Sequence, residues 1–399
     1  MTIVNITPPS KQIPPEQFSL FALGFRPFFL LAGFAAVTLV LGWVLLLVSD
    51  VEFNSYYGVA GWHSHEILFG FATAVIAGFL LTAAKNWTNV QTLNGVGLVG
   101  LVLLWLLARV VALFPHVVPP WIIALLDLAF IPILVVALAV PILKANKKPQ
   151  LVFVAVLTVM FIANVMTHSQ LLGYTSATFE IGTTLMMNCV LLVIAIMAGR
   201  VVPFFTERGA QGAEPKKWPW IEKLAIISLV VLLLAELFVP ASQIVAICFG
   251  VASVAHAVRL FGWYSHRVWS VPLLWVLHLG YSWLVLGLAL KTLALMGIGS
   301  DVIALHALAA AIGVLCLGMM ARVALGHTGR KLDVAKVMAW AFALLNLAMV
   351  VRVFVPMLIP GAAEYAIVFS GALWCAAFVV FLAVYIPILV RARVDGQPG

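Results

Sequence analysis

The sequence predicts an all-α, polytopic integral membrane protein. Hydrophobic residues make up 64% of the 399 residues and charged residues only 9%, whereas soluble domains have about 45–50% apolar and about 25% charged residues. The apolar residues form long runs, and a run of about 20 such residues spans a bilayer as a helix. No alternating strand pattern interrupts these runs, and an open sheet cannot span lipid.

Twelve apolar runs, separated by proline, glycine or charged residues, predict about twelve transmembrane helices. They cover residues 28–48, 62–84, 93–113, 119–143, 151–173, 178–200, 219–239, 241–261, 271–291, 301–324, 335–356 and 362–390. We interpret residues 1–399 as a single transmembrane domain. Its parts are a tail at 1–27, helices one to six within 28–200, a loop at 201–218, helices seven to twelve within 219–390, and a tail at 391–399.

The lysine and arginine residues predict the orientation. With the N-terminus in the cytoplasm, all but Arg109, Lys291 and Arg352 of the 22 basic residues fall on the cytoplasmic side, as the positive-inside rule requires. Both termini are therefore expected in the cytoplasm, and the opening residues lack the features of a signal peptide. This topology accounts for the net charge of +8 without a nucleic-acid partner.

Two further classes of site find no support in the sequence. The four cysteines are far apart within apolar runs, without the spacing of a disulfide framework or a zinc site. No phosphate-binding loop or dinucleotide fingerprint is present, which argues against nucleotide hydrolysis by this chain.

The stretch GWHSHEILFG (61–70) places two histidines and a glutamate at the outer end of the second predicted helix. Depth along the helices puts His63, His65, His168 and His306 in one outer layer. His63 and His65 point about 200° apart on a regular helix, so either the helix begins later or the two rings serve different centres. Glu66 shares a face with His63 and is a candidate to orient that imidazole or to move protons.

Other polar residues within the spans suggest partners for one another. Arg109 and Asp127 face each other across a predicted hairpin, and an ion pair is the expected arrangement. Glu180, Thr184 and Asn188 form a stripe at i, i+4 and i+8. This stripe is either a proton or water path or a set of hydrogen bonds between helices. On a further predicted helix, Asn164 and His168 share a face at i, i+4.

A second set of polar residues lies toward the cytoplasmic side. His278 is deep in its helix, where it is either a hydrogen-bonded core residue or an axial haem ligand. Arginine side chains could pair with haem propionates. The candidate cofactor-binding residues on this side are His278, Arg26, Arg200, Arg322 and His327. Because imidazole suits zinc, copper and iron, the pattern predicts a histidine-rich metal site within the membrane, without specifying the metal.

Five segments together resemble the NnrS family: GFRPFFLLAG (24–33), GWHSHEILFGFATAVIAGFLLTAAKNWT (61–88), GRVVPFFT (199–206), WVLHLGYSWL (275–284) and LHALAAAIGVLCLGMMARVALGHTGR (305–330). The resemblance implies a bacterial inner-membrane protein that contains haem b and copper and is linked to nitric oxide tolerance and denitrification. By motif, it implies that His63 and His65, then His306 and His327, bind metal, and that His278 follows from its own motif. His168 joins the metal set by depth alone.

We therefore expect haem b and copper within the membrane, acting on nitric oxide or a related nitrogen oxide. The outer histidines His63, His65, His168 and His306 would hold metal, and Glu66 would assist. The expected partners are the lipid bilayer, nitric oxide and a membrane electron donor. Two alternatives stay open: a transporter or metal-delivery protein, and a haem-based nitric oxide sensor without turnover. The sequence leaves open which histidine binds which metal and whether the protein is an enzyme.

Overall fold

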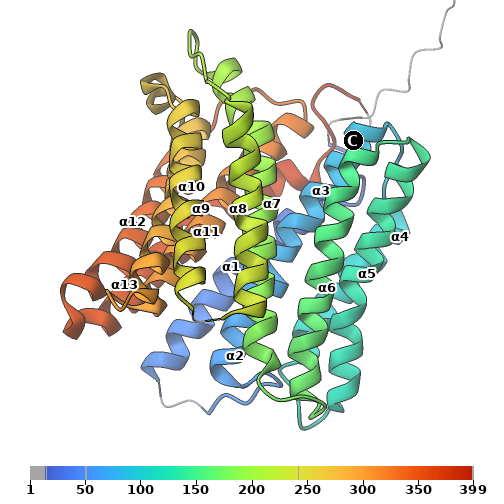
Figure 1. Ribbon diagram of the computed structural model, residues 1–399. Coiled ribbons are helices and arrows are strands. Elements are labelled where there is room, and N and C mark those ends of the chain that lie inside the picture. The colour runs from blue at the N-terminus through green and yellow to red at the C-terminus, as the bar shows by residue number, and fades with distance from the viewer. Residues whose placement is uncertain (1–13, 15, 50–51, 241, 398–399) are drawn as a thin grey trace, which may run out of the picture.

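The computed structural model describes residues 14, 16–49, 52–240 and 242–397 as a bundle of helices (Figure 1). Most of the predicted N-terminal tail lies outside these residues. Among them, no strand forms beyond an isolated bridge between Phe18 and Arg391. The all-α prediction is therefore confirmed.

The helices of the bundle are, in chain order, α1 (Phe25–Val48), α2 (Gly58–His65), the π-helix η1 (Glu66–Ala72), α3 (Thr73–Thr88), α4 (Gly95–Val111), α5 (Pro120–Lys144), α6 (Leu151–Leu171), α7 (Thr178–Gly209), α8 (Pro219–Phe238), α9 (Gln243–Trp263), α10 (Pro272–Leu295), α11 (Asp301–His327), α12 (Lys336–Leu358) and α13 (Ala363–Val390). Short 3₁₀ turns η2 (Lys148–Gln150), η3 (His266–Ser270) and η4 (Pro360–Ala362) lie in the connections. Because α2, η1 and α3 are continuous, each of the twelve predicted runs corresponds to one helical segment.

Ten of these segments, among the described residues, are long and apolar enough to cross a membrane. The other two are α4, which is shorter, and α8, which carries Glu222, Lys223 and Glu236. The polytopic architecture follows from this count. One boundary differs from the prediction: α7 continues to Gly209 and the following loop is shorter than 201–218. The extension is helical because Val202 and Thr206 are buried against the bundle.

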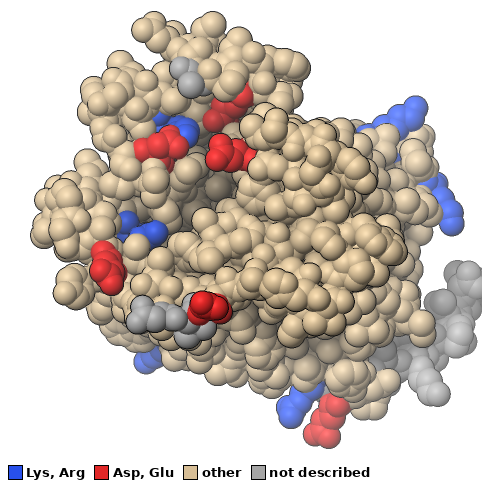
Figure 2. Space-filling model, turned by 90° about the horizontal axis from the view of Figure 1, so that it is seen from below, with Lys and Arg blue, Asp and Glu red and all other residues tan. Residues whose placement is uncertain are grey.

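The two described chain ends meet at one end of the bundle. The Ser19 amide donates to the Val390 carbonyl over 2.8 Å, and the Ala392 amide donates to the Gln17 carbonyl over 2.9 Å. We call this the basic end, because the positive-inside pattern places the basic loops there. At the opposite end, which the same rule assigns to the outer face, the surface is hollowed and acidic and basic side chains gather around the hollow (Figure 2).

The segment α2–η1–α3 is the most enclosed of the ten spans. Of its most apolar window, 83% is buried inside the protein, compared with 28% for α1. Helices α4, α5 and α6 lie on one side of it and α8 to α13 on the other, with the long α7 between them (Figure 1). The polar side chains of His65 and Glu66, at the junction of α2 and η1, are buried and therefore face protein and not lipid.

Candidate metal and cofactor sites

The π-helix η1 lies within the buried span and is hydrogen-bonded to side chains of α4. Its wider turns leave carbonyl groups without the usual helical partner, and π-helices are frequent at functional sites. The Phe69 carbonyl accepts a hydrogen bond from Arg109 Nη1 over 3.0 Å, and the Gly70 carbonyl accepts one from Trp105 Nε1 over 3.2 Å. These two bonds hold the Arg109 guanidinium beside the start of η1, where Glu66 lies.

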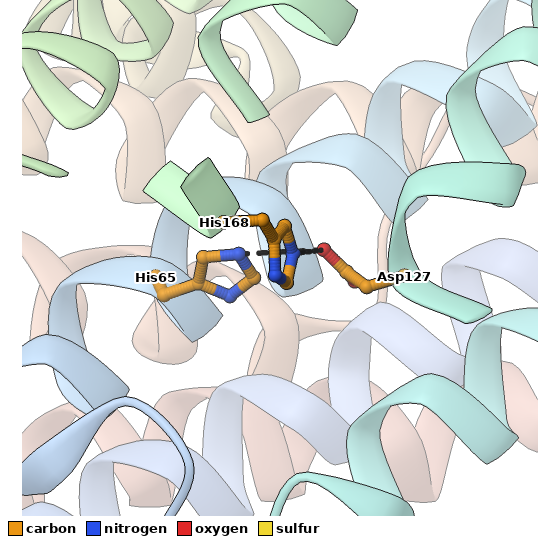
Figure 3. Close-up of side chains that lie close together, drawn as sticks. All are labelled: His65, Asp127 and His168. Atoms are coloured by element: carbon orange, nitrogen blue, oxygen red, sulfur yellow. Dashed lines mark hydrogen bonds and ion pairs between the residues drawn. The ribbon is translucent and has the colours of Figure 1, made fainter. Parts of the chain in front are cut away.

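Three buried side chains from α2, α5 and α6 converge next to this junction (Figure 3). His168 Nε2 lies 2.9 Å from Asp127 Oδ2, and His65 Nε2 lies 3.4 Å from the same oxygen. One ligand atom from each residue lies within 4.8 Å of the others. We call this group the His65–Asp127–His168 cluster. Two imidazoles and a carboxylate form a donor set that suits zinc, copper or iron.

Charged and polar neighbours surround the cluster. Arg109 forms an ion pair with Asp127, as predicted, and its Nε lies 3.1 Å from Glu66 Oε2. Asn164 Nδ2 donates to Asp127 Oδ2 over 2.8 Å, so Asn164 and His168 do share a face. With both imidazoles neutral, two carboxylates and one guanidinium leave one negative charge. A buried net charge is costly, and a bound cation would remove that cost.

Aromatic rings fix both imidazoles of the cluster. Tyr57 stacks on one face of His65 at 3.9 Å between ring centroids, and Phe69 stacks on it at 4.5 Å. The Tyr56 hydroxyl lies 3.3 Å from His168 Nδ1. Burial raises the pKa of both tyrosines, so their phenols stay neutral. Such rigid aromatic packing favours metal binding because little order is lost when the ion enters.

His63 and His306 form a second pair, separate from the first. His63 stacks on Trp43 of α1 at 4.4 Å between centroids, and its buried Nδ1 has no hydrogen-bond partner in the described part of the chain. His306 Nδ1 donates to the Val302 carbonyl over 2.7 Å, and Arg352 Nη2 donates to His306 Nε2 over 2.8 Å. The free nitrogen of His63 makes it the more available ligand.

Two cavities adjoin the His63–His306 pair, and both histidines line each of them. One, of about 90 Å³, has mostly apolar walls and also contacts Arg352. The other, of about 290 Å³, also contacts Glu236 and Asp301. The pair thus lies between a cavity lined mostly by apolar residues and a larger one whose lining also includes acidic residues.

The predicted histidine layer is therefore divided into two sites. His63 and His65 face different surroundings, as their angular separation predicts. Glu66 differs from the expectation: it lies 3.4 Å from His65 Nδ1 and pairs with Arg109, rather than orienting His63. The reason is electrostatic: the carboxylate of Glu66 turns to the guanidinium of Arg109, which is a stronger partner for it than a neutral imidazole.

His278 has both ring nitrogens turned toward backbone carbonyls. Nδ1 lies 3.0 Å from the Leu274 oxygen and Nε2 lies 3.4 Å from the Trp263 oxygen. The surroundings of His278 thus match those of a hydrogen-bonded core residue. Iron ligation by His278 would require one of these two contacts to break.

The other predicted cofactor residues at the basic end have different partners. Arg26 donates to the carbonyls of Leu389 and Arg391, Arg200 to Gln150, Arg322 lies over the Phe205 ring, and His327 lies beside Asn86 and Phe25. Arg26 and His327 both contact Phe25, whereas Arg200 and Arg322 contact other residues. Their role toward a haem stays a prediction.

Two acidic residues matter more in the structure than in the sequence interpretation. Asp127 was expected only as the partner of Arg109, and Glu236 on α8 was not singled out. Asp127 lies inside an apolar span, and Glu236 lies in the apolar part of α8, beyond the first-turn residues Glu222 and Lys223. An ionisable residue within such a segment is by default a functional candidate. That signal was available for both residues.

Comparison with protein families matches the chain to the NnrS family, described as NnrS protein, over residues 19–393. Comparison with curated proteins gives no match. The family match covers nearly all of the chain and includes every residue of both histidine sites. The chain therefore belongs to the NnrS family.

Proposed function

We propose that this protein binds copper at the His65–Asp127–His168 cluster and haem b beside His63, and that it binds or converts nitric oxide or a related nitrogen oxide in a bacterial inner membrane. The observation that carries the metal site is the buried set of two imidazoles and a carboxylate with one surplus negative charge. The cofactors, the gas and the membrane electron donor follow from the family resemblance.

The chain's own residues have defined roles in the copper site. His65, Asp127 and His168 would supply the ligand atoms. Arg109 and Asn164 hold the Asp127 carboxylate in place. A residue that orients a ligand in this way commonly contributes 10–100-fold to metal affinity.

The residues around His63 fit a haem ligand. Its Nδ1 is buried and no described residue bonds to it, Trp43 fixes its ring plane, and an apolar cavity lies beside it. Arg352, in the same cavity, is a cation suited to a propionate. When bound, haem and copper would supply coordination of the gas and one-electron chemistry. We prefer His63 over His278 because both nitrogens of His278 already face carbonyls.

Copper and haem content of the purified protein test this proposal. We expect His65→Ala to lose copper and keep the haem Soret band, and His63→Ala to lose the Soret band. His116→Ala is the control, because His116 is an exposed loop residue bonded to Asn54. Unchanged copper and haem in both site variants would overturn the assignment.

The polar cavity beside His63 and His306 favours one alternative, a transporter or metal-delivery protein. A visible spectrum separates the two, because a colourless protein would exclude haem chemistry. A Soret band that shifts with nitric oxide but shows no turnover with a reductant would identify a sensor.

A further inference from the structure

Two cavities whose linings include charged side chains adjoin at the end of the bundle opposite the basic end, where Figure 2 shows the surface hollowed among charged side chains. Their volumes are about 290 Å³ and about 370 Å³. They share the lining residues Thr184, Asn188, Glu236, Lys291 and Asp301. The first cavity reaches His63 and His306, and the second reaches Glu180 in the first turn of α7. Because the two cavities share these five residues, they adjoin between Glu180 and the histidine pair.

The charges along this space are unbalanced. Lys291 and Asp301 form an ion pair and neutralise each other. Glu236, half-buried on α8, accepts a hydrogen bond of 2.6 Å from Asn188 Nδ2, which offsets part of the cost that burial imposes on its carboxylate form. Glu180 adds a second carboxylate at the outer part. The space therefore has excess negative charge, and a cleft with charge of one sign concentrates ions of the other sign.

The inner end of the space carries an independent sign of a ligand. The buried His63 Nδ1 lacks a hydrogen-bond partner among the described residues, and a buried polar atom is normally bonded to protein or water. Hydrogen bonding between helices alone would account for the contact of Asn188 with Glu236. It would not account for a cavity of this size ending at an unsatisfied imidazole.

We propose that these cavities form a water-filled vestibule through which small hydrated cations reach His63 and His306 from the outer face. Glu236 is its positioning residue, because it lines both cavities and its carboxylate attracts cations. Only the identity of the group that binds at the inner end of the vestibule rests on the proposed function. The small hydrated cations of this proposal include both hydronium and metal ions.

Thiol labelling tests the vestibule without any bound cofactor. In a background with Cys189, Cys248, Cys316 and Cys375 replaced by alanine, Thr184→Cys is exposed to membrane-impermeant methanethiosulfonate reagents added at the outer face of sealed vesicles. We expect labelling, with the cationic reagent reacting faster than the anionic one. The matched control is Val193→Cys, on the same helix but facing an apolar cavity of about 70 Å³, and it should stay unlabelled.

Glu236→Gln tests the source of the charge preference. The ratio of cationic to anionic labelling rates at Thr184→Cys should fall about tenfold, the lower end of the effect of charged clefts, and Glu236→Asp should retain the ratio. Met187 also lines the inner cavity, so Met187→Cys is the alternative labelling position if the Thr184 variant fails to fold. No labelling at either position, or a ratio that Glu236→Gln leaves unchanged, would overturn the proposal. Loss of the copper or haem assignment would leave this result standing.

Discussion

Two buried networks of arginine, carboxylate and histidine lie in different halves of the chain. In the first, Arg109 pairs with both Glu66 and Asp127 beside two histidines. In the second, Glu222 is the one carboxylate within the described residues that pairs with Arg259, with Nη2 2.5 Å from Oε2. The composition is similar, but the ratio of carboxylates to arginines differs.

In the part of the chain that the structure describes, the histidine of the second network has no carboxylate partner. His256 Nδ1 lies 2.5 Å from the Tyr281 hydroxyl, and its Nε2 lies 3.0 Å from the Ala225 carbonyl. Arg259 also donates to Tyr281 over 3.0 Å. This network is neutral and satisfied by protein groups alone. The first one has a surplus negative charge and imidazoles against carboxylates, so it is the one suited to a cation.

Matched amide substitutions give the largest expected effect. Asp127→Asn should remove nearly all bound metal, because it replaces a charged ligand and cancels the surplus charge. Glu222→Gln should leave the metal content unchanged. Elemental analysis of both purified variants measures the difference.

Equal metal loss in the two variants would contradict the comparison. It would indicate that global destabilisation, rather than the ligand, governs metal content. Size-exclusion profiles and helical circular dichroism of both variants provide the check.

Breaking the neutral network should affect stability instead. Arg259→Met leaves Glu222 without its cation, and removal of one partner from a buried pair costs about 3–5 kcal/mol. Since Glu222 is partly exposed, we expect about 3 kcal/mol. Thermal unfolding in detergent measures it, with metal content per folded protein unchanged. A metal loss matching that of Asp127→Asn would count against separate roles for the two networks.

A smaller effect is expected at Glu66, which contacts the cluster without being one of its three ligands. Glu66→Gln keeps the shape but weakens the hold on Arg109 and removes a negative charge. Metal affinity should fall about 10–100-fold, measured by competition with a chelator of known affinity. Gln170→Glu, a change on α6 outside the cluster, is the control. An affinity unchanged by Glu66→Gln would show that Glu66 does not support the ligands.

Helix-level features were predictable because they depend on short stretches of sequence. Apolar runs predicted each spanning segment, and helical periodicity separated His63 from His65. The contact of Arg109 with Asp127 follows from a hairpin, whose two helices must be neighbours. These inferences needed no knowledge of how distant helices pack.

The remainder depended on contacts between distant segments. The π-helix η1 is stabilised by Trp105 and Arg109 of α4, and nothing within residues 66–72 specifies it. Depth alone placed four histidines in one layer, but it could not show that His65 meets His168 while His63 lies beside His306. That division depends on the order of helices around the bundle.

A third arginine–carboxylate pair, exposed at the basic end, gives the smallest expected effect. Arg393 Nη2 lies 2.6 Å from Asp395 Oδ2, and this hydrogen bond lowers the pKa of Asp395 to about 2. A lowered carboxyl pKa favours folding above the unfolded value of about 3.9, and the benefit is lost as pH falls toward 2. Because solvent screens exposed pairs, Asp395→Asn should leave the melting temperature at pH 7 and the metal content unchanged. A marked shift in the melting temperature or in the metal content would mean that burial does not distinguish the three pairs. The difference between the Arg109 and Arg259 networks would then have a cause other than their buried charge balance.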